Sequence, residues 1–166
     1  MKLVQEMLIQ ELFERQVETT PGRTAVIHHD QRLSYGELNQ RANQLAHHLK
    51  KSGVGLESLV GVCLQRSVEA IVSLLAVFKA GGVFLPLDPD YPPQRLEHML
   101  TDSQVDVLIT NAAELAKMAR GVTTVIHLDN DRAEIDREAI GNPERLTRAE
   151  NGAYVIYTSG STGTPK

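Results

Sequence analysis

The sequence predicts an α/β fold with a mainly parallel sheet and flanking helices. Apolar runs rich in β-branched residues alternate with segments whose apolar residues recur at helical spacing. Residues 59–64 (Leu-Val-Gly-Val-Cys-Leu) form a continuous apolar run, which is typical of a strand covered on both faces. Residues 59–87 give the order strand, helix, strand, and such a crossover implies parallel pairing with a right-handed connection.

Composition limits the classes of protein that fit. The 166 residues are enough for one domain with a sizeable core, and 42% hydrophobic with 23% charged residues is ordinary for a soluble protein. A net charge of −4 gives no electrostatic reason to expect nucleic acid or membrane as a partner. No apolar run approaches the length of a membrane span, and the N-terminus lacks an apolar signal core. The single Cys63 forms no intrachain disulfide, which fits a cytoplasmic protein.

The first two helices are indicated by their ends as well as by their spacing. Leu8 and Leu12 stand one turn apart in the first, which a Pro-Gly pair ends. Ser34 and Glu37 fit a capping box at the start of the second, and losing such a cap typically costs about 1 kcal/mol. Gly53 is the expected stop of this helix. The expected elements, in order, are helix 3–20, strand 24–28, a paired strand from 32–33, helix 35–52, strand 59–64, helix 68–80, strand 83–87, helix 94–101, strand 105–110, helix 112–120, strand 122–128 and strand 153–157.

Buried and exposed segments are also distinguishable. The helix over 68–80 is apolar nearly all round and is expected to be buried, with Ser67 as its cap. Cys63 is interpreted as a small buried hydrophobe rather than a nucleophile. The highly charged stretch 129–151 is typical of a solvated excursion, which we favour over a binding surface.

No metal site is expected from the histidines. The pairs His28-His29 and His47-His48 lack further ligands at a suitable spacing, so we interpret them as solvated residues.

The C-terminal stretch carries the predicted chemistry. Residues 153–157 (Ala-Tyr-Val-Ile-Tyr) are expected to form a buried strand. Glycines in the following loop let the backbone approach a ligand, successive N–H groups bind anions, hydroxyls donate, and a lysine adds one positive charge. The predicted phosphate-binding residues are Thr158, Ser159, Gly160, Ser161, Thr162, Gly163 and Lys166.

A P-loop, a dinucleotide-binding turn and a flexible linker each fit this loop less well. The common P-loop needs glycine directly before the lysine, where this chain has Pro165, and the dinucleotide fingerprint G-x-G-x-x-G does not match. A flexible Ser/Thr/Gly linker fits the composition, but linkers seldom follow a core strand directly.

Three stretches resemble one enzyme family. Residues 157–166 (Tyr-Thr-Ser-Gly-Ser-Thr-Gly-Thr-Pro-Lys) match, at every fixed position, the phosphate-loop signature of adenylate-forming enzymes: acyl-CoA synthetases, luciferases and the adenylation domains of non-ribosomal peptide synthetases. Residues 78–96 are very similar to the second recurring segment of those adenylation domains, with Phe84 and Leu85 in place of the commoner Tyr-Val. Residues 33–38 resemble the first recurring segment, whose role looks structural.

Asp88, Asp90 and Arg95 in the second segment suggest catalysis at first sight. We interpret them as holding their loop, because short Asp and Pro side chains favour turns by local bonding.

The resemblance implies a function and its cofactors. Residues 1–166 correspond to an incomplete N-terminal subdomain of an adenylation domain, and the C-terminal subdomain is absent. The intact protein is expected to activate an amino acid with ATP as aminoacyl-AMP and to load it onto the phosphopantetheine of a peptidyl carrier domain. The predicted loop holds the β- and γ-phosphates, and Lys166 acts as the catalytic cation. The Mg²⁺ ligand, the amino-acid pocket and the lysine of the small subdomain lie beyond Lys166.

Two alternatives remain open. The first is a fragment of an acyl-CoA or aryl-acid ligase that uses the same adenylate chemistry. The second is a non-catalytic, truncated nucleotide-binding piece, which we expect for the 166 residues on their own. A strand around Tyr154 without its following helix leaves a sheet edge open, and such an edge predicts aggregation.

Overall fold

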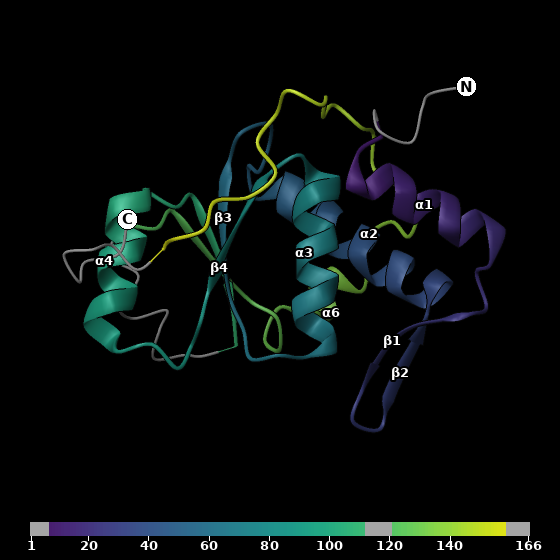
Figure 1. The fold of residues 1–166 in the computed structure, drawn as a ribbon, viewed down its shortest axis with the longest axis horizontal. Helices are drawn as coiled ribbons and strands as arrows, with labels where there is room; N and C mark the ends of the chain where they lie inside the picture. Colours follow the sequence, from purple (N-terminus) through teal and green to yellow (C-terminus); the bar gives the residue numbers. More distant parts are fainter. Residues whose placement is uncertain (1–6, 112–120, 159–166) are drawn as a thin grey trace.

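The fold has three layers, with a parallel sheet between two layers of helices (Figure 1). The structure is a computed structural model, and it describes residues 7–111 and 121–158. The expected helix 112–120 therefore lies outside the described residues. The elements are α1 Ile9–Thr19, β1 Thr24–His28, β2 Gln31–Ser34, α2 Tyr35–Lys51, β3 Leu59–Cys63, α3 Val68–Ala80, β4 Val83–Leu87, α4 Pro93–Ser103, β5 Val107–Thr110, β6 Thr124–His127 and α6 Arg132–Ile135.

The main sheet confirms the predicted α/β class. Its strand order is β4-β3-β5-β6, and all three pairings are parallel. Val60 on β3 lies opposite Phe84 on β4 and opposite Val107 on β5. A separate antiparallel hairpin joins β1 to β2, as the short paired strands predicted.

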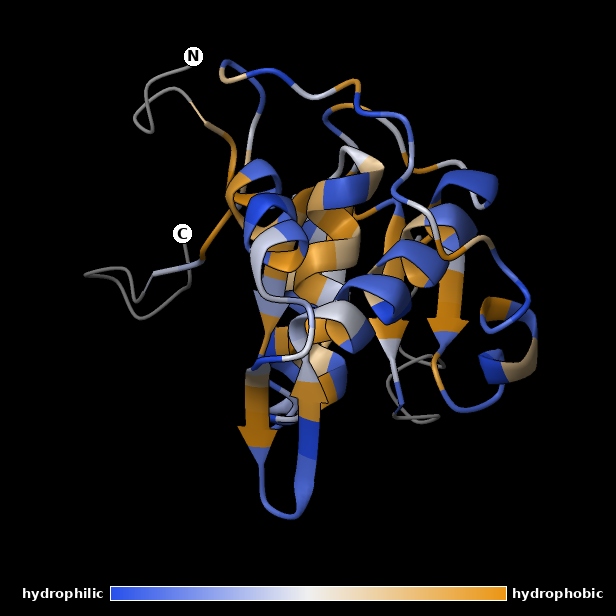
Figure 2. Ribbon diagram, turned by 90° about the vertical axis from the view of Figure 1, so that its right-hand side faces the viewer, coloured by the Kyte–Doolittle hydropathy of each residue, from blue (hydrophilic) through white to orange (hydrophobic). Residues whose placement is uncertain are grey.

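Each face of the sheet has its own core. Helices α2 and α3 cover one face, where Leu45 and Leu49 of α2 are buried in the same cluster as Val60 of β3. Helix α4 covers the other face with Leu96, Met99 and Leu100, as the separation of α4 from α3 in Figure 1 shows. Figure 2 shows apolar residues concentrated on the strands and helices that meet at these two interfaces.

The predicted helix ends are confirmed. The Ser34 Oγ accepts from the Glu37 N–H at 3.3 Å, and a Glu37 carboxylate oxygen accepts from the Ser34 N–H at 2.8 Å. Ser67 caps α3 by accepting from the Ala70 N–H. Gly53 follows the end of α2 with a φ of 94°, a conformation that side-chain-bearing residues rarely adopt. Helix α3 is buried along most of its length, as its all-round apolar sequence predicted.

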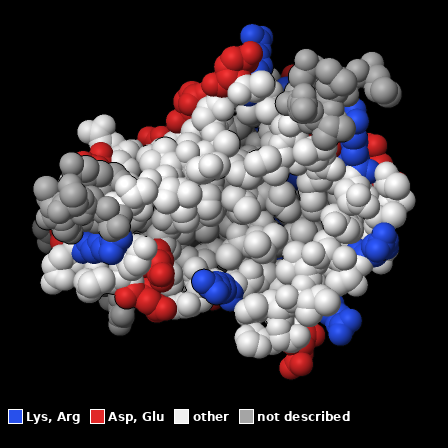
Figure 3. All heavy atoms as spheres, in the orientation of Figure 1, with Lys and Arg blue, Asp and Glu red and all other residues white. Residues whose placement is uncertain are grey.

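The prediction of a buried strand over 153–157 is wrong. Tyr154 forms one parallel bridge to Phe84 on the outer edge of β4, and Val155 donates to the Phe84 carbonyl at 2.9 Å. Tyr154 is 60% exposed and Ile156 is 57% exposed. Within the described residues, no strand or helix packs against the side of this segment that faces away from β4. Its apolar side chains therefore have few neighbours. Figure 3, in the same view as Figure 1, shows few charges at the centre of the face that this segment crosses.

The charged stretch 129–151 is only partly the solvated excursion that we predicted. Most of its side chains are exposed, but it includes the short helix α6, and residues 136–144 form hydrogen bonds with α2 while residues 145–152 continue to α1 and Glu57. We call residues 136–152 the strap. Side chains of α2 donate to strap carbonyls: Asn43 to Ile140 and Gln44 to Asp136, both at 2.7 Å. His47 is 3.0 Å from the Gly141 carbonyl, so this histidine has a backbone partner in the strap.

A buried lysine connects three parts of the chain. The side chain of Lys79, on α3, is 1% exposed, and its Nζ is 2.5 Å from Glu14 Oε1 on α1. The same ammonium donates to Asn142 Oδ1 in the strap at 3.1 Å. Arg145 of the strap also pairs with Glu14, at 3.4 Å. Helix α1 and the strap are therefore held to α3 by charge-assisted hydrogen bonds.

Across the described ranges, no helix is long and apolar enough to cross a membrane.

Candidate nucleotide-binding edge

The carboxyl ends of the strands form the edge of the sheet where ligands bind in open α/β folds. The loops 64–67 and 88–92 leave this edge after β3 and β4, and Asn111 follows β5. The segment 153–158 runs parallel to β4 with Tyr154 opposite Phe84. This is the single bridge of the segment, and three residues further on Tyr157 contacts Asp102 in the last turn of α4. The position of the phosphate loop at the carboxyl edge therefore stays a prediction.

Only the first of the predicted phosphate-binding residues can be placed. Thr158 is described and exposed. The others lie outside the described residues: Ser159, Gly160, Ser161, Thr162, Gly163 and Lys166.

Tyr157 holds the chain directly before Thr158. Its hydroxyl donates to Oδ2 of Asp102 in the last turn of α4, and its ring packs against the apolar cluster under α4. Burial, together with the hydrogen bond and charge of Asp102, raises the pKa of Tyr157 to about 12. The phenol therefore stays protonated and remains a donor at neutral pH.

The loop after β4 is held by its own side chains. Asp88 Oδ1 accepts from the Asp90 N–H at 3.0 Å, and Gln65 Nε2 donates to Asp90 Oδ1 at 2.8 Å. The guanidinium carbon of Arg95 lies 3.9 Å from the centre of the Tyr91 ring. These contacts agree with the interpretation of Asp88, Asp90 and Arg95 as loop-holding residues.

Two hollows flank this loop. One has a volume of about 660 Å³ and lies between the β1–β2 hairpin and the carboxyl ends of β3 and β4, with His28, His29, Arg66 and Asp88 in its lining. This groove was not predicted from the sequence. The only sequence feature that could have indicated it is Arg66, which follows the buried strand β3.

The second hollow, of about 380 Å³, is lined in part by Cys63, Ser67 and Asn111. Cys63 is buried, and burial and the charge of Asp88 raise the pKa of its thiol to about 12. The thiolate is the nucleophilic form of cysteine, so Cys63 is unreactive, in agreement with its interpretation as a buried hydrophobe.

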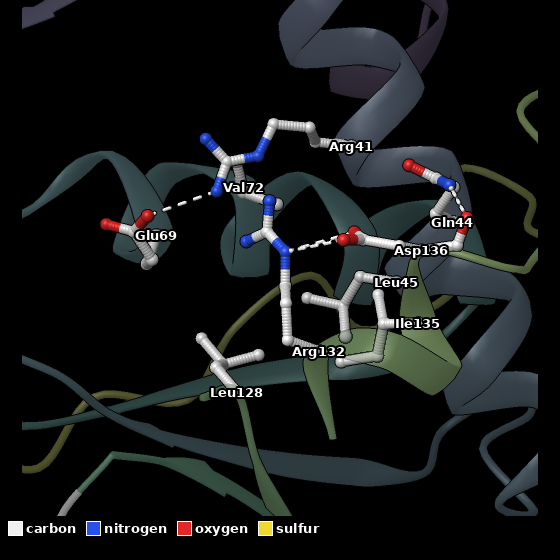
Figure 4. A pocket seen from close by; sticks show the side chains of 9 residues that line it. All are labelled: Arg41, Gln44, Leu45, Glu69, Val72, Leu128, Arg132, Ile135 and Asp136. Atoms are coloured by element: carbon white, nitrogen blue, oxygen red, sulfur yellow. Dashed lines mark hydrogen bonds and ion pairs between the residues drawn. The ribbon is translucent and has the colours of Figure 1, made fainter. Parts of the chain in front are cut away.

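A third cavity, between α2, α3 and α6, is structural in character (Figure 4). Its volume of about 20 Å³ accommodates a single water molecule. Arg41 and Glu69 form an ion pair at 3.0 Å, and Arg132 and Asp136 form another at 3.0 Å. Burial alone would raise the pKa of Glu69, but the hydrogen bond and charge of Arg41 hold it below its ordinary value.

The described part of the chain offers no place for a metal. In residues 7–111 and 121–158, no three His, Cys, Asp or Glu side chains are arranged so that they could hold an ion.

The fold and the sequence define a class: a parallel α/β domain whose last residues are rich in Ser, Thr and Gly. A family model for AMP-binding enzymes matches residues 13–166. The chain therefore belongs to the AMP-binding enzyme family, as its three recurring segments predicted.

Individual relatives show which members of the family the chain resembles. One component of the linear gramicidin synthase of Brevibacillus parabrevis is 47% identical over 161 residues, which are 97% of this chain but 3% of that protein. The non-ribosomal peptide synthetase FmoA3, solved in its α-methyl-L-serine-AMP-bound form, superimposes with a TM-score of 0.84 at 28% identity. That match covers 96% of this chain and 18% of FmoA3. The chain thus spans a small part of the proteins that it matches.

A fatty acyl CoA synthetase of Mycobacterium tuberculosis superimposes equally well, with a TM-score of 0.85 at 22% identity over 95% of this chain and 33% of that protein. At this identity the likeness shows the fold alone.

Proposed function

We propose that the protein carrying this chain activates an amino acid with ATP and loads it onto the phosphopantetheine arm of a peptidyl carrier domain. The observation that carries the proposal is the 47% identity to a linear gramicidin synthase along 97% of this chain. Residues 1–166 form the first part of the N-terminal subdomain of an adenylation domain, and the C-terminal subdomain is not among them. We assign the activity to the cytoplasm, where ATP and reduced thiols are available.

Adenylation makes an unreactive carboxylate into an acyl donor. A free carboxylate is a poor acyl donor because its leaving group is oxide. Attack of the carboxylate oxygen on the α-phosphorus of ATP forms a P–O bond, breaks the bond to the β-phosphate and releases pyrophosphate. The thiol of phosphopantetheine then attacks the acyl carbon, and AMP leaves with the oxygen that it gained from the carboxylate.

The chain's own contribution is to bind the phosphates. Thr158 and the loop that follows it bind the β- and γ-phosphates, and Lys166 neutralises charge on the departing pyrophosphate. Nucleotidyl transfer depends mostly on positioning and charge stabilisation, so a loop of N–H, hydroxyl and ammonium donors is suited to the task. In support, FmoA3 has also been solved with AMPPNP bound, at 29% identity to this chain. We assign the binding of the magnesium ion that accompanies ATP to residues outside the described part of the chain.

An acyl-CoA or aryl-acid ligase is the second candidate. The TM-scores of 0.84 for the peptide synthetase and 0.85 for the fatty acyl CoA synthetase do not discriminate between the two functions. The sequence favours amino-acid activation, because segment 78–96 resembles the peptide synthetases.

A non-catalytic, truncated nucleotide-binding piece is the third candidate. The intact mass of the natural gene product tests this alternative, since a mass far above 18.3 kDa is expected for a working enzyme.

Amino-acid-dependent ATP–pyrophosphate exchange by the full-length gene product tests the proposal. A panel of amino acids, fatty acids and aryl acids is expected to give exchange with an amino acid. Lys166→Ala should slow the exchange, whereas Lys51→Ala, which changes an exposed lysine on α2, should not. Exchange that depends only on fatty or aryl acids would overturn the amino-acid assignment, and unchanged exchange in Lys166→Ala would overturn the role of the loop.

A further inference from the structure

We propose that Asn151 is a site of spontaneous deamidation and that the carboxylate of Glu57 protects it in the folded chain. The sequence contains one Asn-Gly pair, Asn151-Gly152, at the end of the strap. A backbone nitrogen can attack the side-chain amide carbon of an asparagine directly before it. A glycine nitrogen is the least hindered, because glycine has no side chain and the most mobile backbone. This pair is therefore where the reaction is easiest in the sequence.

The reaction needs only water as a co-reactant. The Gly152 nitrogen forms a bond with Cγ of Asn151, the bond from Cγ to Nδ2 breaks, and ammonia leaves with the proton that the Gly152 nitrogen gives up. Water then opens the cyclic imide at either of its carbonyl groups. The product carries a carboxylate at position 151, either as aspartate or as isoaspartate with the main chain running through Cγ.

In the folded chain, the groups that react are held by hydrogen bonds. Glu57 Oε1 accepts from Asn151 Nδ2, the leaving group, at 2.7 Å and from the Gly152 N–H, the nucleophile, at 3.2 Å. We call these two contacts the clasp. Asn151 Oδ1 accepts from the Arg148 N–H at 2.8 Å, so both ends of the amide are fixed. The lone pair left by the departing proton lies along the former N–H direction, which the clasp aims at Glu57 rather than at Cγ.

The charge of Glu57 opposes the reaction as well. The nitrogen attacks after it has lost its proton, and a negative charge that forms beside a carboxylate is unfavourable. A carboxylate, with an ordinary pKa of about 4.3, is also far too weak a base to remove a proton from a backbone amide. Glu57 therefore protects the pair rather than promoting its reaction.

The surrounding chain holds the clasp in place. Glu57 has a φ of 62°, and a residue with a side chain keeps such a conformation only where its surroundings enforce it. The next residue, Ser58, accepts through its carbonyl from the Val83 N–H at 2.8 Å, at the start of β4. A Cβ on Gly152 would lie 3.0 Å from Val83 Cγ2 and 3.2 Å from Glu57 Oε2. This close approach favours glycine at position 152 and so retains the susceptible pair.

Deamidation should prevent the clasp from closing again. The reaction replaces Asn151 Nδ2, a donor 2.7 Å from Glu57, by a carboxylate oxygen, so that two negative charges face each other. The segment 153–155 continues from the clasp and pairs with β4 through backbone hydrogen bonds of Ala153 and Val155 with Phe84. Without the clasp, we expect this pairing to open more often.

The test is peptide mapping by mass spectrometry of the full-length gene product, incubated folded or in urea at mildly alkaline pH. The tryptic peptide that begins at Ala149 reports deamidation of Asn151. The folded wild type should deamidate roughly tenfold more slowly than the unfolded chain, or slower still. Glu57→Ala should speed the reaction in the folded protein by roughly tenfold, the effect of losing two hydrogen bonds at an exposed site. It should not change the rate in urea, where the clasp is absent.

Glu150→Ala is the matched control, because it removes an exposed carboxylate from the residue next to Asn151. It should leave the rate in the folded protein near the wild-type value. A slower reaction in Glu57→Ala would show that the carboxylate promotes deamidation. An unchanged rate in that variant, equal rates in the folded and unfolded wild type, or no deamidation in urea would each overturn the inference too. None of these measurements involves ATP, so the proposed function is tested separately.

Amide hydrogen exchange tests the consequence for the segment 153–155. Asn151→Asp should speed exchange there by roughly tenfold, because the clasp cannot form. Adding Glu57→Gln should restore slow exchange, since the glutamine amide donates to the new carboxylate while its oxygen still accepts from the Gly152 N–H. Wild-type exchange in Asn151→Asp, or no recovery in the double variant, would contradict the role of the clasp in holding this segment.

Discussion

The lone thiol of Cys63 illustrates how environment, rather than residue type, decides reactivity. It lies at the end of β3, buried and close to the negative charge of Asp88, and these two effects raise its pKa to about 12. Against the ordinary value of 9.0, the thiolate fraction at pH 8 falls by roughly a thousandfold. Iodoacetamide should therefore label the native chain negligibly and label the urea-unfolded chain completely, as mass spectrometry would show.

Cys63→Ser provides the control, since it should take up no label in either state. Complete labelling of the native chain within minutes would contradict the buried environment.

The ion pair of Lys79 and Glu14 should respond unequally to loss of its two partners. Glu14→Gln leaves a buried ammonium without its counter-charge, at a cost of about 3 kcal/mol in the free energy of unfolding. Lys79→Met should cost about 1 kcal/mol or less, because methionine fills the space and Glu14 keeps Arg145 as a partner. Urea denaturation measures both. Glu18→Gln, an exposed change on the same helix, should be nearly neutral, and a larger cost for Lys79→Met than for Glu14→Gln would refute this account.

Lys79 also predicts a direction of pH dependence. Burial lowers the pKa of Lys79, and the hydrogen bond and charge of Glu14 offset this only in part. Between the folded-state pKa and the ordinary value of 10.5, the unfolded chain binds more protons, so a rise in pH favours folding. The stability of the wild type relative to Lys79→Met should therefore increase as the pH rises toward 10.5. A decrease measured by urea denaturation at a series of pH values would show that the sign is wrong.

At the scale of elements, α2 and the strap show which contacts a sequence predicts. The cap of α2 could be predicted because Ser34 and Glu37 stand three residues apart, within one turn. The strap could not, because its contacts with α2 join residues 87 to 103 positions apart. Many of them end on backbone carbonyls, which carry no residue signature. The mixed charge of the strap correctly predicted that most of its side chains are exposed, but it did not predict that the strap is attached to α2.

Asn142 is the side chain that most closely joins the strap to the helices. Its Oδ1 lies within hydrogen-bonding distance of Asn43 at 2.9 Å and of Lys79 at 3.1 Å. Asn142→Ala leaves these donors without that acceptor and should destabilise the chain by about 1–2 kcal/mol. Amide hydrogen exchange should also become faster in the strap, while β3 and β5 remain protected. Asn130→Ala, an exposed asparagine outside the strap, should do neither, and unchanged exchange in Asn142→Ala would contradict the proposed attachment.

For the candidate site too, some features could be inferred from the sequence and others could not. Its expected location at the carboxyl edge and the expected phosphate loop were inferred from the strand order and a local motif, and both stay predictions. The contact of Asp102 with Tyr157 could not be predicted, because it depends on how α4 packs against the sheet. The same dependence explains the wrong prediction for 153–157: the continuous run of apolar, β-branched and aromatic residues indicates a buried strand, but burial requires neighbours on both sides, and the described residues supply only β4.

For the molecule as a whole, the open edge beside β4 is the main departure from a closed core. Tyr154, Val155 and Ile156 are exposed on a face whose centre carries few charges (Figure 3). An apolar, partly paired edge is a template for pairing with another chain. The 166-residue chain on its own should therefore self-associate, and its sedimentation coefficient should rise with concentration. Ile156→Lys should reduce this association, because a charged side chain on a strand edge disfavours pairing with a second copy.

Ile140→Lys separates the edge from general solubility. Ile140 is 58% exposed, nearly the same as Ile156 at 57%, but it lies in the strap rather than beside β4. Both variants add the same charge, so equal suppression of association would mean that net charge, and not the edge, is responsible. Suppression by Ile156→Lys alone would place the association at the edge that leads into the phosphate loop. A wild-type chain that remains monomeric at all concentrations would show that the exposed segment is too short to pair, because a single bridged residue offers a second strand very few backbone groups.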